Sequence, residues 1–275
     1  MSMQPSFGLF IFGDEILSGK RQDRHFEQVK SILSARGLAL SWVTVLGDDR
    51  SRAVRALRDS FASGDVVFSC GGIGSTPDDH TRQAAAEALG VDLALHPEAE
   101  ALIRARAAET GQPASLERLR MGEFPVGSQI IPNPFNRIPG FFLKDHYFVP
   151  GFPVMAWPMI EWVLDSRFSK HFRSVAETDK SMIVLDLYEA AVTPLMNAMC
   201  ERYPQFRFYS LPSAGDDGRP RHVELGVKAS GLGTRASEVS ETSDASAALV
   251  RAYEEFRQGV RDLGGVIAEE REAQR

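Results

Sequence analysis

The segment CGGIGSTPDDHT, residues 70–81, combines three glycines with two neighbouring aspartates. Gly71, Gly72 and Gly74 let backbone N–H groups approach an anion closely, and a helix beginning behind them favours negative charge. The segment follows a buried-strand pattern and precedes a helical one. This order places it at the carboxyl end of a parallel sheet, where open α/β sheets bind ligands. The pattern predicts a phosphate-binding loop.

The same residues also fit an ordinary helix start. Thr76 as N-cap, Pro77 at the first helical position and Asp79 in the first turn would begin a helix that runs to about Leu89. Helix capping alone leaves the glycines and Asp78 without a role. We therefore expect this segment both to cap the helix and to bind a ligand.

Asp78 and Asp79 would by themselves repel a phosphate. A divalent cation removes this conflict, because Mg²⁺ prefers a few carboxylates together with phosphate oxygens. The loop therefore indicates metal-assisted chemistry at a phosphate or pyrophosphate.

A second polar segment, residues 13–23 (GDEILSGKRQD), follows the first strand pattern. In a doubly wound sheet the first strand can lie beside the third, which would bring both segments to one edge. Asp14, Glu15 and Asp23 add acidic groups, and Lys20 and Arg21 could hold phosphate. The alternative is a plain loop in which Asp23 caps the next helix.

Several other functions are excluded or disfavoured. Pro77 occupies the position of the third glycine of a Rossmann motif, and the Gly13–Lys20 spacing is one residue too long for a P-loop. The net charge of −6 argues against nucleic-acid binding. Two cysteines allow neither a disulfide scaffold nor a cysteine-rich zinc site, and no targeting or membrane segment is evident, so we expect a cytoplasmic protein.

The elements that must position these segments alternate between strand and helix. Residues 7–12, 41–46 and 65–69 have strand patterns and are separated by helical ones, while 141–143 and 147–149 resemble a tight hairpin before a helix that begins at Pro153. This order predicts a three-layer α/β/α fold with a mostly parallel sheet.

The composition changes after this region. We expect a first domain over residues 1–166, a polar linker over 167–180 and a small α+β domain over 181–268 with the order βαββα. The last residues, 268–275, are expected to form a frayed, solvated tail.

At this point the sequence resembles a known family. GDEILSG at 13–19 with Asp23, GGIGSTPDDHTR at 71–82 and VPGFPVMAW at 149–157 are similar to the N-terminal domain of the competence/damage-inducible CinA family. That domain belongs to the molybdopterin-binding group with MogA and MoaB. The resemblance covers roughly residues 7–165, and the small second domain fits too. The chain ends before the amidase domain of full-length members, so deamidation is not assigned.

The resemblance implies divalent-metal-dependent hydrolysis, with Mg²⁺, Mn²⁺ or Co²⁺, of ADP-ribose-like pyrophosphates to AMP. It implies Asp14, Asp78 and Asp79 as catalytic acids, with Asp14 and Asp78 as metal ligands. The residues expected to bind the ligand are Gly13, Lys20, Asp23, Gly71, Gly72, Gly74, Ser75, Thr76, Gly151 and Phe152.

Two other functions stay open: a non-catalytic molybdopterin- or nucleotide-binding protein, and a molybdopterin adenylyltransferase. The family usually has Asp-Thr-Asn where this chain has Asp23-Arg24-His25, a change that favours the binding protein. His25, His80 and His96 are weak candidates, since histidines at helix starts are commonly solvated. We expect a small-molecule ligand, no nucleic acid, no membrane, and a homodimer or homotrimer.

Overall fold

The strand β1 (Phe7–Phe12) consists of five apolar residues and one glycine, and all six are buried. In the computed structural model, which describes residues 5–172, 178–215, 220–229 and 239–274, β1 lies between β2 (Leu40–Leu46) and β3 (Val66–Cys70). It runs parallel to both. The predicted neighbourhood of the first and third strands is therefore confirmed.

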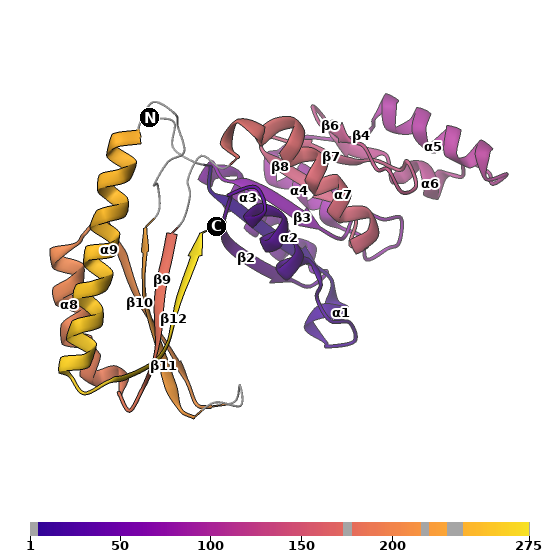
Figure 1. The fold of residues 1–275 in the computed structure, drawn as a ribbon. Helices are drawn as coiled ribbons and strands as arrows, with labels where there is room; N and C mark the ends of the chain where they lie inside the picture. Colours follow the sequence, from indigo (N-terminus) through magenta and orange to yellow (C-terminus); the bar gives the residue numbers. More distant parts are fainter. Residues whose placement is uncertain (1–4, 173–177, 216–219, 230–238, 275) are drawn as a thin grey trace. The chain divides into compact units, whose positions relative to one another are not determined.

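Three more strands complete this sheet on the far side of β3 (Figure 1). The strand β8 (His146–Val149) is parallel to β3, and β7 (Gly140–Leu143) is antiparallel to both of its neighbours, β8 and the edge strand β6 (Gln129–Ile131). The turn residues Lys144 and Asp145 both have positive φ, as a two-residue hairpin turn requires. The predicted hairpin is confirmed.

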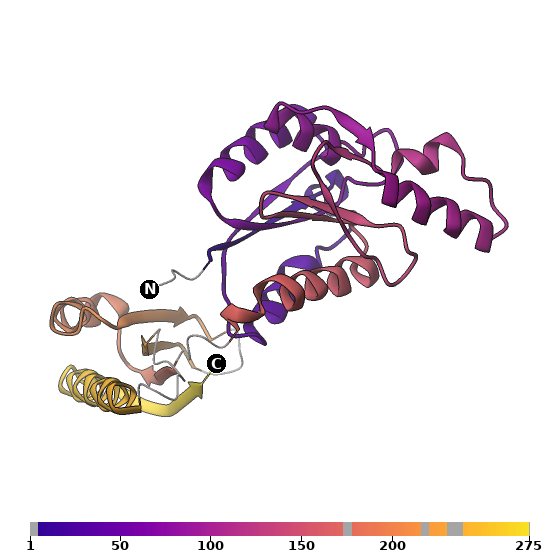
Figure 2. The same ribbon diagram turned by 90° about the horizontal axis from the view of Figure 1, so that it is seen from above.

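Helices cover both faces of this sheet (Figure 2). The helices α3 (Arg50–Ser63) and α4 (Thr81–Leu89) pack on one face, and α2 (His25–Ser34) and α7 (Pro153–Val163) on the other. Every second strand residue points into each layer, as strand geometry requires. The α3 and α4 layer is a core of Phe10, Val67 and Phe148 against apolar helix residues. The predicted three-layer architecture is confirmed.

Shorter elements fill the connections. A four-residue turn of helix, α1 (Asp14–Leu17), follows β1. An excursion between α4 and β6 contains β4 (Leu93–Leu95), α5 (Pro97–Glu109), α6 (Leu116–Arg120) and β5 (Glu123–Pro125). After α7 come a π-helical turn (Leu164–Phe168), which crosses the expected domain boundary at residue 166, and a 3₁₀ turn (Ser169–His171), which lies within the expected linker over 167–180.

The chain divides into two units: Met1–Ser34 with Ala39–His171, and Ala35–Leu38 with Phe172–Arg275. The second unit has the order β9 (Thr178–Leu185), α8 (Glu189–Arg202), β10 (Arg207–Ser213), β11 (His222–Ala229), α9 (Val239–Asp262) and β12 (Val266–Gln274). Its strands form one antiparallel sheet in the order β10-β11-β9-β12. This arrangement is ferredoxin-like.

The strand β12 corrects the expectation of a frayed tail. Its backbone pairs with β9 along the length of that strand. The charged side chains of β12 find partners on β9 and α9: Glu272 pairs with Lys180, and Glu270 with Tyr253 and Arg257. The unit is therefore βαββαβ. The helices α8 and α9 cover one face of its sheet with an apolar core (Figure 1).

Candidate functional site

The carboxyl ends of β2, β1, β3 and β8 meet at one edge of the six-stranded sheet, because these four strands are parallel. A cavity of about 400 Å³ lies among the loops that follow them. Its lining includes Gly13, Glu15 and Arg21 after β1, Asp48 after β2, residues 71–76 with Asp78 and Asp79 after β3, and Pro150, Gly151 and Phe152 after β8. The structure therefore brings most of the predicted site residues together.

The glycine loop offers backbone donors to this cavity. The N–H groups of residues 72–75 donate to no acceptor in the part of the chain that the structure describes, whereas Gly71 N–H donates to Val149 O at 3.0 Å. Gly71 has a φ of 103°, and a Cβ there would lie 2.6 Å from Phe12 O. Glycine is thus required by the close approach of two strand ends, and four successive amides remain available for an anion.

The helix behind this loop begins later than the sequence analysis expects. Residues 76–79 form a turn in which Thr76 N–H and the Thr76 hydroxyl donate to Asp79 Oδ2, at 2.9 and 2.5 Å. The helix α4 starts at Thr81 after His80, whose side chain makes no capping bond. The prediction of Thr76 as N-cap is wrong, because its side chain is used in the turn.

Asp78 and Asp79 have different environments. Asp79 closes the turn, so its carboxylate serves the loop itself. The carboxylate of Asp78 is exposed, and its pKa is lowered, first by the nearby Thr76 hydroxyl and then by its own backbone N–H. Asp78 therefore carries its charge at neutral pH and faces solvent at the mouth of the cavity.

Arg82 supports the loop from beneath. It is a charged residue with only 3% of its surface exposed, and its Nη2 donates to Gly74 O at 2.5 Å. Burial lowers its pKa, and the carboxylates of Asp79 and Glu123 counteract part of this effect. We did not predict Arg82; a signal was present, since an arginine falls on the face of an Ala-rich helix that packs inward.

Asp48 is a second residue that the sequence analysis missed. It lines the cavity, and its carboxylate accepts from Asp14 N–H at 2.9 Å, while Asp14 Oδ1 accepts from Asp48 N–H at 3.1 Å. The pKa of Asp48 is raised, first by burial and then by the nearby charges of Asp14, Glu15 and Asp78. Its position after a parallel strand was the available signal.

These acids concentrate negative charge beside the amide donors. Among the residues that the structure describes, no three or more His, Cys, Asp or Glu side chains form a metal-holding group. A divalent cation at this edge would therefore rely on one or two carboxylates, with phosphate and water as its remaining ligands. Asp48 and Asp78 line the cavity, and Asp14, one of the two predicted metal ligands, does not.

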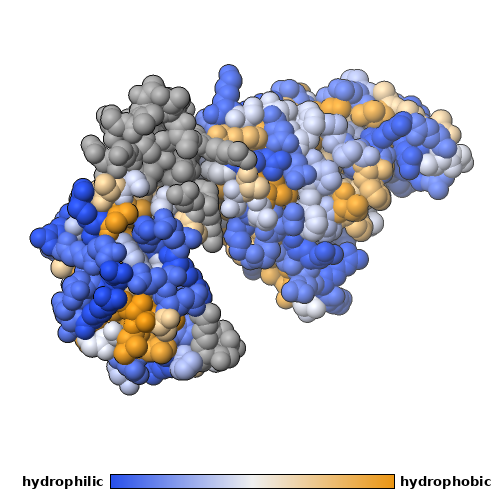
Figure 3. Space-filling model, viewed as in Figure 1, coloured by the Kyte–Doolittle hydropathy of each residue, from blue (hydrophilic) through white to orange (hydrophobic). Residues whose placement is uncertain are grey.

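Only some of the polar residues in the segment after β1 line the cavity. Arg21 lines the cavity and lies 4.0 Å from the Glu15 carboxylate. Lys20 is exposed and does not line the cavity. Asp23 accepts from the backbone N–H groups of His25 and Phe26, so it acts as the cap of α2. Figure 3 shows the strongly hydrophilic surface around α1.

A second cavity, of about 350 Å³, adjoins the first and shares Phe12, Glu15, Arg21, Gly151 and Phe152 with it. His25 lines this cavity, is 5% exposed and lies 3.0 Å through Nε2 from Gly151 O. The expectation of a solvated His25 is wrong, because the ring connects the start of α2 to the loop after β8. His80 and His96 line neither cavity.

Comparison with known proteins identifies the family to which the first unit is similar. Residues 8–170 match the family model described as "Probable molybdopterin binding domain". The chain belongs to this family. The predicted resemblance to CinA-type members is also confirmed: a CinA-like protein of Anaeromyxobacter is 32% identical over 233 residues, which cover 78% of this chain and 57% of that protein.

Two further comparisons show how much of the chain related proteins cover. A protein of Aeropyrum pernix is 27% identical over 98% of this chain and 99% of its own length. The crystal structure of CinA, a protein of unknown function from Thermoplasma acidophilum, superimposes with a TM-score of 0.53 at 25% identity. It covers 58% of this chain and 98% of that one.

No helix among the described residues has the length and apolar character needed to cross a bilayer.

Proposed function

We propose that the first unit binds a nucleotide or pterin through a phosphate and hydrolyses a nucleotide pyrophosphate with a divalent cation. One observation carries this proposal: the amides of residues 72–75, which donate to no acceptor among the described residues, border the same cavity as the carboxylates of Asp48 and Asp78. Donors suit phosphate oxygens, and carboxylates suit a hard cation. A ligand with both groups, a phosphate and its metal, satisfies both sides of the cavity.

The residues present fit such a cation. The pKa of Asp48 is raised, first by burial and then by the charges of Asp14, Glu15 and Asp78, which supports a cation at this edge. Asp48 and Asp78 would hold the cation together with the phosphate. When bound, the cation would neutralise developing phosphate charge as a Lewis acid.

The chain's own groups have separate tasks. The amides of residues 72–75 would bind the phosphate and stabilise its charge, held in place by Arg82 on Gly74 O. Arg21 lines both cavities and could bridge the two halves of a pyrophosphate. Phe152, which is 56% exposed between the cavities, would stack on a base or pterin ring.

A non-catalytic binding protein for molybdopterin or a nucleotide is the second candidate. The described residues hold no group of three or more potential metal ligands. This observation favours a protein that binds its ligand without metal-dependent catalysis. An adenylyltransferase acting on molybdopterin would use the same phosphate-binding loop and would consume ATP.

One assay separates these functions. The full chain is incubated with ADP-ribose, FAD, NAD⁺ or ATP in Mg²⁺, Mn²⁺ or Co²⁺, and AMP release is measured. We expect AMP that disappears with EDTA and with Asp78→Asn, while Asp59→Asn, an exposed aspartate of α3 outside both cavities, keeps full activity.

The alternative outcomes are equally distinct. Binding of AMP or molybdopterin without turnover would replace the hydrolase by a binding protein. ATP consumption that requires molybdopterin would assign the transferase.

A further inference from the structure

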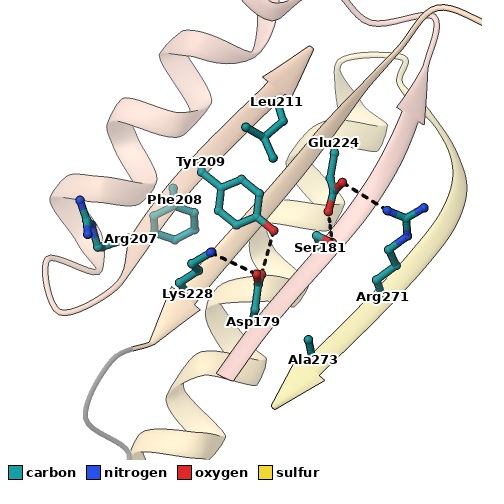
Figure 4. Close-up of a pocket in the computed structure, with 10 residues that line it drawn as sticks. All are labelled: Asp179, Ser181, Arg207, Phe208, Tyr209, Leu211, Glu224, Lys228, Arg271 and Ala273. Carbon is teal, nitrogen blue, oxygen red and sulfur yellow. Dashed lines mark hydrogen bonds and ion pairs between the residues drawn. The ribbon is translucent and has the colours of Figure 1, made fainter. Parts of the chain in front are cut away.

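The face of the second unit's sheet opposite α8 and α9 carries a hollow of about 650 Å³ (Figure 4). Its size lies in the range of small-molecule sites. The described residues place no helix of this unit over it, since α8 and α9 pack on the other face. All four strands contribute lining residues, including Asp179 from β9, Tyr209 from β10, Lys228 from β11 and Arg271 from β12.

The acidic groups of this hollow are already engaged. Asp179 Oδ1 accepts from the Tyr209 hydroxyl at 2.8 Å, and Asp179 Oδ2 lies 3.5 Å from Lys228 Nζ. Glu224 Oε1 accepts from the Ser181 hydroxyl at 2.7 Å, and Glu224 Oε2 accepts from Arg271 Nη1 at 3.3 Å. All four carboxylate oxygens therefore have partners within the hollow.

Donor capacity remains on the cationic side. The lining holds three cations, Arg207, Lys228 and Arg271, and two carboxylates, and Arg271 is also paired through Nε with Glu269 at 2.7 Å. Within the part of the chain that the structure describes, Arg207 is exposed and no carboxylate pairs with it. Lys228 Nζ is 3.5 Å from a single carboxylate oxygen. The donor capacity that remains on Arg207 and Lys228 suits an anion.

An aromatic surface lies beside these cations. The Tyr209 ring lies flat over β11, and a Cβ on Gly226 would collide with it, so glycine at that position is what admits the ring. Figure 4 shows the ring face-on, with Leu211 next to it. Leu211 is 56% exposed, which extends the apolar surface. A planar ring can stack on such a surface.

We propose that this hollow binds a planar aromatic phosphate of the nucleoside monophosphate class, with its ring on Tyr209 and its phosphate near Arg207 and Lys228. The site is separate from the sheet edge of the first unit and does not depend on the function proposed there. The carboxylates of Asp179 and Glu224 fix the Tyr209 hydroxyl and Arg271 and so shape the site. Burial raises the pKa of Tyr209, so its hydroxyl remains a donor to Asp179.

The proposal states where a nucleotide binds. Photolabelling of the full chain with 8-azido-AMP tests it, because peptide mass spectrometry identifies the labelled segments. We expect labelled peptides from β10 and β11. AMP should protect these peptides from labelling at concentrations at least about tenfold lower than those at which adenosine or ribose 5-phosphate protects them. Arg207→Ala should reduce labelling of these peptides by at least about tenfold. Arg261→Ala, which removes an exposed arginine near the end of α9, is the matched control and should leave it unchanged.

Three results would overturn the proposal. They are labelling confined to the first unit, equal labelling of the Arg207→Ala and Arg261→Ala variants, and protection by ribose 5-phosphate as effective as by AMP. Labelling of β10 and β11 that persists in Asp78→Asn would support it, whether or not the first unit hydrolyses a pyrophosphate. Arg207 is exposed, so its variant should fold, and circular dichroism checks this.

Discussion

Asp14 and Asp48 each accept a hydrogen bond from the backbone N–H of the other, at 2.9 and 3.1 Å. This reciprocal pair joins the loop after β1 to the loop after β2, and it holds two carboxylates close together. Such an arrangement is unfavourable without a cation, because like charges repel. Removal of one of these two charges should therefore relieve repulsion between the two loops.

Asp48→Asn should separate stability from activity. The amide keeps an acceptor for Asp14 N–H and removes one negative charge, so we expect a melting temperature equal to or above that of the unchanged protein. Metal-dependent AMP release should fall on the order of 10²-fold, the size typical of losing one preorganised electrostatic contact. Thermal unfolding in EDTA and the AMP assay measure the two effects, and a variant with full activity would remove Asp48 from the proposed cation site.

Arg82→Met should destabilise the first unit by about 3 kcal/mol, because it leaves Gly74 O and Asp79 without a buried cationic partner. Urea unfolding measures this change. Arg50→Met is the control, since Arg50 pairs with Glu87 at a half-exposed surface position and such pairs contribute little. Equal stability of the two variants would contradict a supporting role for Arg82.

Phe152→Ala should weaken ligand binding without unfolding the chain. The ring is 56% exposed, so its removal costs little stability, whereas loss of stacking on a base is worth about 1–3 kcal/mol, or roughly 10- to 100-fold in affinity. Phe135→Ala is a matched control, because Phe135 is 57% exposed and lines neither cavity. Titration with AMP compares the two variants, and equal affinities would exclude stacking by Phe152.

Stability should fall in mild acid because of His146. This ring is 2% exposed, its Nε2 lies 2.7 Å from the Ser60 hydroxyl, and burial lowers its pKa from 6.5 to about 4. Because the unfolded chain takes up the proton first, the free energy of unfolding should drop by about 2 kcal/mol between pH 7.5 and 5. The loss should level off below about pH 4, where both states are protonated.

Urea titrations across this range check the prediction. His146→Phe should remove most of the fall between pH 7.5 and 5, whereas His171→Phe, at a half-buried position, should retain it. The same fall in both variants would assign the pH dependence to other groups.

The first unit was predictable from sequence because its strands are uniformly apolar. The six residues of β1 and the five of β3 are all buried, and their patterns show it directly. By contrast, β12 has charged residues on both faces and no apolar alternation. Its pairing with β9 and its contacts with Lys180, Tyr253 and Arg257 come from segments distant along the chain, which a local pattern does not contain.

The site was predictable at the level of loops and less so at the level of single residues. The glycine loop and Phe152 were found because motif and position agree. Asp48 was missed because one aspartate after β2 carries no motif, and Arg82 because its significance depends on burial. Asp23 and Lys20 lie in the right segment, but the carboxylate of Asp23 caps α2 and Lys20 lines neither cavity. The roles proposed for Asp14, Asp78 and Asp79, and the expected homo-oligomer, stay predictions.

The glycine loop is fastened to its surroundings at three points: Gly71 N–H on Val149 O, Thr81 N–H on Gly72 O, and Arg82 on Gly74 O. None of these contacts involves residues 75–78. Within this segment Thr76 donates to Asp79 and Asp78 is the proposed cation ligand, so these two residues would be kept. Ser75 and Pro77 can be exchanged while the flanking contacts hold the loop on the sheet. Libraries confined to these two positions offer a route to altered ligand preference on an unchanged scaffold.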